Sequence, residues 1–391
     1  MPNDTLNCLV TIITSYYNDQ DFLADAIKSV LAQSYSNWEY ILINHASTDK
    51  SRSIAHSFKD PRIKHIDLTK NYGASGNLLV KKGLEKAHGT YIKLHCADDI
   101  LYPTALNTLV QTALKNKADL VFGNVQFVDR HQKSLNKTWF THRFPANLPP
   151  ENYIRSLLKS ISCFPYAGNL IKKTAFDKIP LDYVCVNLAD MELWACMLLT
   201  QAKLAFTNEC VCSYRMHDKN LCSAGQADII HRRNLFEHLL FMQTLLNTAP
   251  SVELLKKIFP TDSLSRKLTS EDQSLVPFVM AYALSKDSPL PVFRQAIRLK
   301  MAQMLNDYTL QQQIEHKFGY SIKDLRNSVL KTPLQTIPAN ELLSQYQDLK
   351  AARLSTLGYF FFRKFFHILL LRDYRQYRRK KRLAKNTNEV I

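Results

Sequence analysis

The sequence is poor in several features that identify common classes of protein. Only nine of its 391 residues are glycine, and no G-x-G-x-x-G or G-x-x-x-x-G-K-[ST] pattern occurs. This argues against a Rossmann dinucleotide site and a Walker A loop. None of the eight cysteines belongs to a C-x-x-C pair, so a zinc site is not expected. Several cysteines stand in apolar runs, as free thiols in a reducing cytoplasm do.

Targeting and membrane-spanning patterns are also missing from the sequence. The N-terminus lacks a basic region and begins a strand pattern almost at once, so we expect no signal peptide. No stretch of about 20 uncharged apolar residues occurs, so no spanning helix is expected. Acidic residues are few, with 34 against 51 basic ones, and the formal net charge is +17. A charge of this sign predicts an anionic partner, which could be a phosphate-bearing substrate, an acidic membrane or nucleic acid.

The first hundred residues alternate between strand and helix patterns. Apolar, β-branched runs typical of buried strands cover residues 8–14, 40–43, 63–67 and 91–94. Apolar residues at helical spacing cover residues 21–33, 50–58 and 71–86. This alternation predicts an α/β fold with a mostly parallel sheet flanked by helices. Ligands of such sheets bind at the carboxyl ends of the strands.

Asp98 and Asp99 directly follow the last of these predicted strands. Two adjacent carboxylates repel each other unless a cation lies near them. Oxygen ligands suit Mg²⁺ or Mn²⁺, and these ions usually join a few carboxylates to substrate phosphates. The alternative is a simple turn, because Asp is common where strands end.

Four segments of the chain, taken together, resemble the family-2 glycosyltransferases, which have the GT-A fold. They are LVTIITSYYNDQDFLADAIKSVLAQSYSNWEYILINHASTDKS, NYGASGNLLVKKGLEKAHGTYIKLHCADDILYP, NLADMELWACML and YRMHDKNLCS. They stand in the family's order and span about residues 8–223. The resemblance implies a nucleotide-sugar donor bound over the sheet, a Mg²⁺ or Mn²⁺ ion on its diphosphate, and inversion at the anomeric carbon.

The resemblance also assigns roles to residues by their position in these segments. Asp98 and Asp99 fall in the motif that binds the metal and the donor diphosphate. Asp190 falls where the family keeps its general base, and its apolar neighbours should raise its pKa. The other donor-side residues are Thr14, Tyr16 and Asn18 near the nucleobase, Asn44 and His45 after the second strand, and Tyr214, Arg215 and His217 in a loop over the diphosphate. His217 is also a candidate metal ligand.

Two of these assignments have structural alternatives. Asp190 could simply be a helix N-terminal residue that the helix dipole favours, although one residue can fill both roles. His217 could be a histidine of a surface turn.

The chain departs from the family pattern at three places. Asn44 and His45 stand where the family usually has two acids, one of which commonly contacts the nucleobase. Cys96 stands where many members have another Asp, so the metal site has fewer carboxylates than usual. Thr14 replaces a common proline. Because Asp98, Asp99 and Asp190 are retained, an active enzyme is expected.

The second half of the chain predicts two further regions. We expect a glycosyltransferase domain over residues 1–224, a helical appendage over 225–350 and a basic amphipathic tail over 351–391. Within the first domain, residues 120–128 and 166–171 predict strands, and the polar residues 129–150 predict an irregular loop on the acceptor side. The appendage carries no chemical motif, and packing and oligomerisation are its interpretations.

The tail concentrates the positive charge of the chain. It holds eleven Lys and Arg residues against two acids, next to the aromatic run of residues 357–371. This pattern is typical of a helix that lies in the interface of an anionic membrane. It predicts peripheral association with the inner, cytoplasmic face of the cell membrane. A helix docked on the protein is the alternative, and no nucleic-acid module is recognised.

The sequence therefore predicts an inverting, metal-dependent glycosyltransferase. It would transfer a sugar to a saccharide or glycolipid acceptor in the assembly of a bacterial surface polysaccharide. One alternative is a nucleotidyltransferase, which needs a glycine-rich, basic loop after the first strand. Residues 15–21 contain neither glycine nor a basic side chain. The other alternative is a non-catalytic basic interaction protein with a degenerate transferase fold.

Overall fold

The computed structural model describes residues 8–72, 76–159, 161–181, 185–186, 188–218, 220, 237–238, 240–287, 291–321, 323–324 and 327. Contacts divide the chain into one compact unit, Met1–Thr332, and a second, Pro333–Ile391. The second unit lies outside the described residues, and so does the basic tail. The division into three domains stays a prediction.

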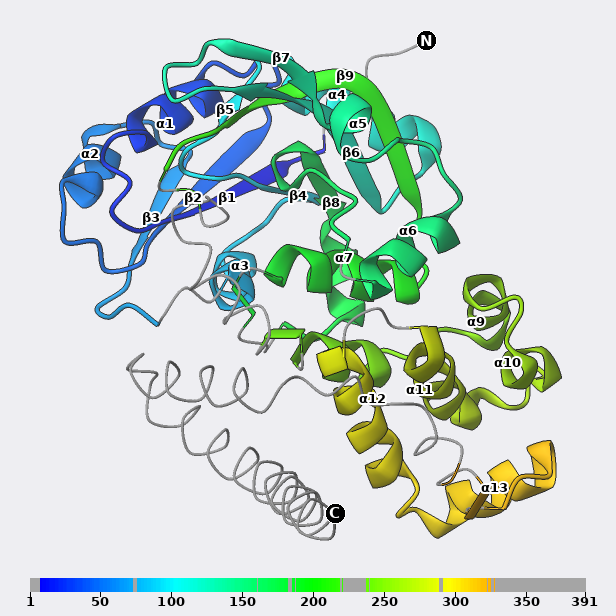
Figure 1. The fold of residues 1–391 in the computed structure, drawn as a ribbon. Helices are drawn as coiled ribbons and strands as arrows, with labels where there is room; N and C mark the ends of the chain where they lie inside the picture. The colour runs from blue at the N-terminus through cyan, green and yellow to red at the C-terminus, as the bar shows by residue number, and fades with distance from the viewer. Residues whose placement is uncertain are drawn as a thin grey trace, which may run out of the picture. The chain divides into compact units, whose positions relative to one another are not determined.

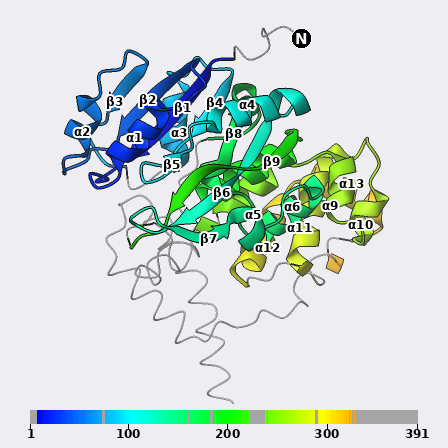
Figure 2. The same cartoon turned by 90° about the horizontal axis from the view of Figure 1, so that it is seen from above.

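The described strands form one mixed sheet. They are β1 (Val10–Tyr16), β2 (Trp38–Asn44), β3 (Ile63–Asp67), β4 (Tyr91–Leu94), β5 (Ile100–Leu101), β6 (Leu120–Val128), β7 (Ser134–Thr138), β8 (Asn169–Lys172) and β9 (Leu204–Arg215). Their order is β3-β2-β1-β4-β8-β6-β9-β5, and β7 pairs with β6 outside this path. Figure 2 shows β3, β2, β1 and β4 following one another across the sheet.

The first four strands in this order are parallel, as the alternation of strands and helices predicts. In their register Tyr16 lies opposite Asn44, and Asn44 lies opposite Asp67. The carboxyl ends of β1, β2 and β3 therefore meet at one edge. β8 joins β4 and β6 by antiparallel pairing, and β6 pairs in parallel with β9. The α/β fold with a largely parallel sheet is confirmed.

Helices cover both faces of this sheet. The helices are α1 (Leu23–Leu31), α2 (Ser51–Ser57), α3 (Gly76–Leu84), α4 (Ala105–Asn116), α5 (Trp139–His142), α6 (Pro150–Leu158), α7 (Ala189–Leu199), α9 (Val252–Ile258), α10 (Ser263–Lys267), α11 (Val276–Asp287), α12 (Pro291–Met304) and α13 (Tyr308–Phe318). Successive side chains of a strand point to opposite faces. Ile12 accordingly packs with residues of α1 and α4, and Ile13 with residues of α3 and α7. Figure 1 shows α3 and α7 on one side of the sheet.

Two segments differ from the sequence-based prediction. Residues 129–150 contain β7 and α5, because Asp129 closes a hairpin by accepting hydrogen bonds from the backbone N–H of His131 and Lys133. Residues 166–171 begin with a 3-10 turn, Tyr166–Gly168, before β8. A Cβ atom at Gly168 would lie 2.2 Å from the carbonyl oxygen of Gly123, so only glycine allows this approach.

Helices α9 to α13 continue the apolar core on the α7 side of the sheet. The core that contains α6 and α7 also contains Leu255, Phe278 and Ile314. Arg155 of α6 donates to the carbonyl oxygens of Lys257 and Ile258 at the end of α9. Among the described residues, none of the helices combines the length and the apolar character that crossing a membrane requires.

Candidate active site

Side-chain amides tie together the carboxyl ends of β1, β2 and β3. The Asn44 amide nitrogen donates to Asp67 Oδ1 over 3.1 Å, and the Asn44 amide oxygen accepts from the N–H of Ser47 over 2.9 Å. Asn18 accepts from the N–H of Thr48 over 2.9 Å and has a left-handed backbone, with φ of 58°. Asn tolerates this conformation better than most residues. Asn18 and Asn44 therefore fix the loops that follow β1 and β2.

Thr14 and Tyr16 support this edge from inside the protein. Thr14 is fully buried, and its hydroxyl oxygen accepts from the Tyr40 hydroxyl over 3.0 Å. Tyr16 is 2% exposed, and burial raises the pKa of its hydroxyl. The structure thus brings both residues to the predicted edge of the sheet, but beneath its surface.

His45 lies among aromatic rings at the same edge. Its Nε2 accepts from the N–H of Tyr72 over 2.8 Å, and burial lowers the pKa of its imidazole. The His45 ring stacks on Tyr72 with centroids 6.0 Å apart and contacts Tyr17 edge-on at 6.3 Å. Tyr17 and Tyr72 are 45% and 41% exposed. Sequence analysis placed Tyr17 at the end of the first strand but gave neither ring a role.

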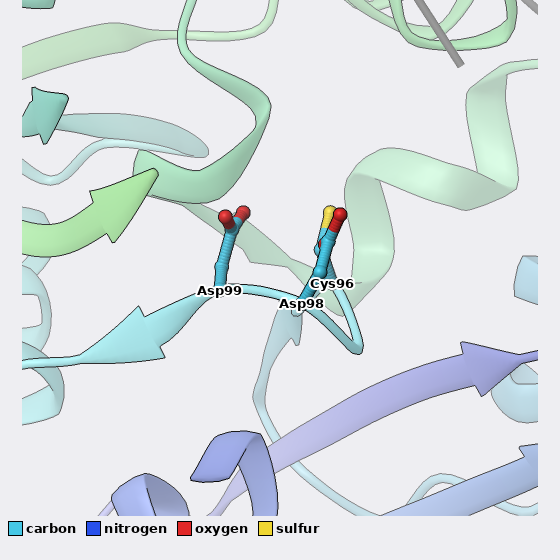
Figure 3. A group of neighbouring side chains, drawn as sticks. All are labelled: Cys96, Asp98 and Asp99. Atoms are coloured by element: carbon cyan, nitrogen blue, oxygen red, sulfur yellow. The ribbon is translucent and has the colours of Figure 1, made fainter. Parts of the chain in front are cut away.

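Cys96, Asp98 and Asp99 form a cluster in the turn between β4 and β5. One ligand atom from each residue lies within 4.8 Å of the other two, and Figure 3 shows all three side chains pointing the same way. Asp99 is 1% exposed, and its Oδ1 accepts from the N–H of Arg215 over 3.0 Å. Its Oδ2 is buried without a hydrogen-bond partner in the described part of the chain. Buried polar atoms normally have a partner, so this oxygen points to a ligand.

The electrostatics of the cluster favour a cation. Burial, and then the negative charge of Asp98, raise the pKa of the Asp99 carboxyl well above its usual range. Burial and the two carboxylates raise the pKa of the Cys96 thiol in the same way. A divalent ion would reverse both effects by stabilising the charged forms. The residues present therefore fit a metal ion.

Lys93 lies within the protein behind this cluster. It is fully buried in β4, and its ammonium donates to the carbonyl oxygens of Leu94 and Ala167 over 2.8 and 2.9 Å. Burial lowers its pKa to about 8, and the charge of Asp99 opposes this shift. Sequence analysis missed Lys93, although a lone lysine within a buried strand pattern was a visible signal.

His217 meets the cluster from the loop after β9. Its side chain is 3% exposed, and its Nε2 lies 3.1 Å from Asp98 Oδ2. The amide nitrogen of Asn220 donates to the same oxygen over 3.1 Å. The His217 ring packs on Phe22, with centroids 4.4 Å apart. The structure thus brings His217 and Asn220 to Asp98.

Arg215 contacts the cluster through its backbone. Its N–H binds Asp99, while its guanidinium lies 3.2 Å from Asp25 Oδ2 and 4.8 Å from the centre of the Phe22 ring. Arg215 is 4% exposed. In this structure its side chain therefore binds α1 and the loop before it. The adjacent Tyr214 packs edge-on against Phe127 at 5.6 Å.

Asp190 lies half-buried in the first turn of α7. Its Oδ1 accepts from the N–H of Met191 over 2.8 Å, and burial raises its pKa to about 6. The charges of Cys96 and Asp190 both raise the pKa of Tyr166, after burial. Tyr166 is therefore within electrostatic reach of both the cluster and Asp190. The Asp190 carboxyl, with its pKa raised to about 6, and the cluster of Cys96, Asp98 and Asp99 are thus both near Tyr166.

The chain is similar to several known proteins. The family model described as glycosyl transferase family 2 matches residues 11–180. An uncharacterized glycosyltransferase of Rickettsia typhi, RT0329, is 30% identical over 228 residues, covering 56% of this chain and 67% of the relative. WfgD of Escherichia coli, a UDP-Glc:alpha-D-GlcNAc-diphosphoundecaprenol beta-1,3-glucosyltransferase, is 28% identical over 218 residues, covering 55% and 80%. The structure of S. aureus TarS 1–349 with UDP aligns at a TM-score of 0.45 and 14% identity, covering 80% and 92%.

Proposed function

Because the chain belongs to glycosyltransferase family 2, we propose that it is an inverting enzyme that uses a nucleotide-sugar donor and a divalent metal ion. One observation carries the metal and donor site: Asp99 Oδ2 is buried without a partner beside Asp98 and Cys96. This oxygen lies in the turn after β4, where ligands of parallel sheets bind.

Asp98 and Asp99 would hold the ion, Mg²⁺ or Mn²⁺, and His217 is a further candidate ligand. Such an ion supplies positive charge that stabilises a nucleoside diphosphate as it leaves. Lys93 adds a fixed positive charge within the protein. The Arg215 guanidinium would have to leave Asp25 to reach a phosphate, so we assign its main effect to the backbone N–H that orients Asp99.

The nucleobase would bind beside the carboxyl ends of β1 and β2. The open rings of Tyr17 and Tyr72 offer faces on which a base can stack. His45 contacts both rings, Asn18 and Asn44 lie at the same edge of the sheet, and Thr14 and Tyr16 support this edge from inside. No acid follows β2 directly, so the base would be recognised by neutral donors and acceptors.

Asp190 would act as the general base for the acceptor hydroxyl. The acceptor oxygen attacks the anomeric carbon from the face opposite the diphosphate, its proton passes to Asp190, and the carbon–oxygen bond to the diphosphate breaks. This single displacement inverts the anomeric configuration. A base of this kind contributes about 10²–10⁴-fold to the rate, most effectively when its pKa lies near the working pH.

For the acceptor we propose a lipid-linked saccharide in surface-polysaccharide assembly. The support is the relative WfgD, whose name describes a GlcNAc-diphosphoundecaprenol acceptor. An acceptor of this kind resides in a membrane, which agrees with the strongly basic balance of the chain. Residues 225–350 would form an appendage to the catalytic domain of residues 1–224, with packing and oligomerisation as its roles.

A donor screen tests this function. Full-length protein is mixed with UDP-sugars and GDP-sugars, with Mn²⁺ or with a chelator, and the shift in its melting temperature is measured. We expect one donor class to stabilise the protein, with a smaller shift under chelation. Slow hydrolysis of that donor should accompany binding. If no nucleotide sugar binds with metal present, the proposed donor site is wrong.

Removing residues 355–391 should release the protein from anionic membranes and leave the donor site intact. The tail of residues 351–391 carries eleven basic residues against two acids, and each basic residue near an anionic leaflet contributes about 1 kcal/mol. Co-sedimentation with neutral and anionic liposomes measures this, and high salt should weaken the attachment. A full-length protein that ignores anionic liposomes, or a truncated one that unfolds, contradicts the membrane proposal.

A further inference from the structure

We propose that Cys96 is a metal ligand beside Asp98 and Asp99, and that its sulfur strengthens the binding of Zn²⁺ and Co²⁺ far more than that of Mg²⁺, with Mn²⁺ between them. This inference rests on the proposed function in one respect, namely that the cluster binds a divalent ion. It adds Cys96 as a third ligand and predicts which divalent ions the site prefers.

The geometry places the sulfur where a ligand would stand. One ligand atom of each residue lies within 4.8 Å of the other two, so the group could hold one metal ion among them. In Figure 3 the Cys96 sulfur lies beside an Asp98 oxygen, and the Asp99 carboxylate points the same way. All three residues belong to one short turn between β4 and β5, so the backbone holds them together.

A second observation points to a ligand in the same place. Asp99 is 1% exposed, and its Oδ2 has no hydrogen-bond partner among the described residues. Leaving such an oxygen unsatisfied is unfavourable, and more so when it is charged. The N–H of Arg215 holds the other oxygen, Oδ1, which fixes the carboxylate and leaves Oδ2 for an ion.

Because of the charges around the cluster, the Cys96 sulfur determines which metal ions bind most strongly. The buried ammonium of Lys93, held by two carbonyl oxygens, offsets part of the negative charge of Asp98 and Asp99. A hard ion such as Mg²⁺ depends on oxygen ligands and gains little from sulfur. An ion that binds sulfur strongly can displace the thiol proton of Cys96 to the solvent and gain a thiolate ligand.

The alternative is that Cys96 only fills space, as buried cysteines commonly do. Spectroscopy of bound cobalt separates the two, because a thiolate–cobalt bond adds a charge-transfer absorption band that carboxylates do not give. Cys210 provides a matched control. It is a free, half-buried cysteine in β9 and does not belong to the Cys96, Asp98 and Asp99 group.

The experiment titrates the full chain and three variants with Co²⁺, and then with Zn²⁺, Mn²⁺ and Mg²⁺ by calorimetry. We expect the band in the native protein and in Cys210→Ser, and its loss in Cys96→Ser and Cys96→Asp. Cys96→Ser should lower Zn²⁺ affinity by about tenfold or more, since even changes outside the ligand shell cost 10–100-fold. Cys96→Asp should raise Mg²⁺ affinity. Circular dichroism checks that each variant is folded.

The experiment distinguishes a failure of the Cys96 proposal from a failure of the proposed metal site. If Co²⁺ binds the native protein without the band, or if Cys96→Ser keeps both the band and the native Zn²⁺ affinity, Cys96 is no ligand and the carboxylate site stands. If none of the four ions binds, both this inference and the proposed metal site are wrong.

Discussion

Replacing Asp190 by Asn is expected to slow sugar transfer by at least about a hundredfold and to leave donor binding almost unchanged. The amide is nearly isosteric with the carboxylate and can still accept from the N–H of Met191, so α7 should keep its first turn. An amide cannot take the proton of the acceptor hydroxyl. The loss should therefore appear in kcat measured with acceptor, and donor affinity measured without acceptor should not change.

The pH dependence of transfer should report the same group. Burial raises the pKa of Asp190 to about 6, and the base acts only when it is deprotonated. Transfer by the native enzyme should therefore rise with pH through about 6 and then level off. In Asp190→Asn this rise should disappear from the residual rate. A pH profile of kcat between mildly acidic and mildly basic conditions measures both.

Glu192 supplies a matched control on the same helix. It is 1% exposed, accepts from the Asn77 amide over 3.1 Å and from the Thr244 hydroxyl, and has its pKa raised to about 6 by burial. Because these contacts join α7 to its neighbours, Glu192→Gln should alter stability and keep the pH profile of transfer. Native turnover in Asp190→Asn, or the same loss of the pH profile in Glu192→Gln, contradicts the assignment of the base.

Local sequence patterns predicted much of the sheet. The predicted bounds of β3, β4 and β6 match the structure, because each is a short run of strand-forming residues between clear breaks. Asp98 and Asp99 were singled out because adjacent carboxylates after a strand stand out locally, whereas Asp190 was assigned only through the resemblance to the family. The closeness of Asp98 and Asp99 to Cys96 also follows from their spacing.

Long-range packing decided what the sequence could not reveal. The ammonium of Lys93 binds the carbonyl of Ala167, 74 residues away, and no local pattern predicts that pairing. The guanidinium of Arg215 binds Asp25, 190 residues away, although its position suggested a phosphate ligand. The inward orientation of Thr14 and Tyr16 depends on which face of β1 each residue occupies, and both faces are covered by helices.

Replacing Asp99 by Asn is expected to abolish metal-dependent donor binding and, at the same time, to stabilise the metal-free protein. Without a metal, a buried carboxylate beside Asp98 is unfavourable, and its pKa is raised well above the usual range. Asparagine keeps an oxygen for the N–H of Arg215 and removes the charge. Stabilising changes at strained functional sites commonly add about 0.5–2 kcal/mol to the free energy of unfolding.

The sign of the pH dependence distinguishes this effect from ordinary packing. A carboxyl whose pKa is raised by folding binds a proton more tightly in the folded state, so the native protein gains stability as pH falls and loses it as pH rises. Asp99→Asn lacks this dependence. The stability of Asp99→Asn should therefore exceed that of the native protein by the largest amount at neutral pH. The difference in stability should shrink in acid.

The gain in stability is measured by denaturant unfolding at acid and at neutral pH with a chelator present. The loss of donor binding is measured by titration with donor in the presence of Mn²⁺. Asp98→Asn is the control, because the Asp98 side chain is 24% exposed and already binds His217 and Asn220. It should also lose donor binding but gain less stability, since less of its charge is buried. If Asp99→Asn is destabilised at neutral pH and still binds donor with Mn²⁺, then Asp99 is a structural residue, and the unpaired Oδ2 does not mark a metal site.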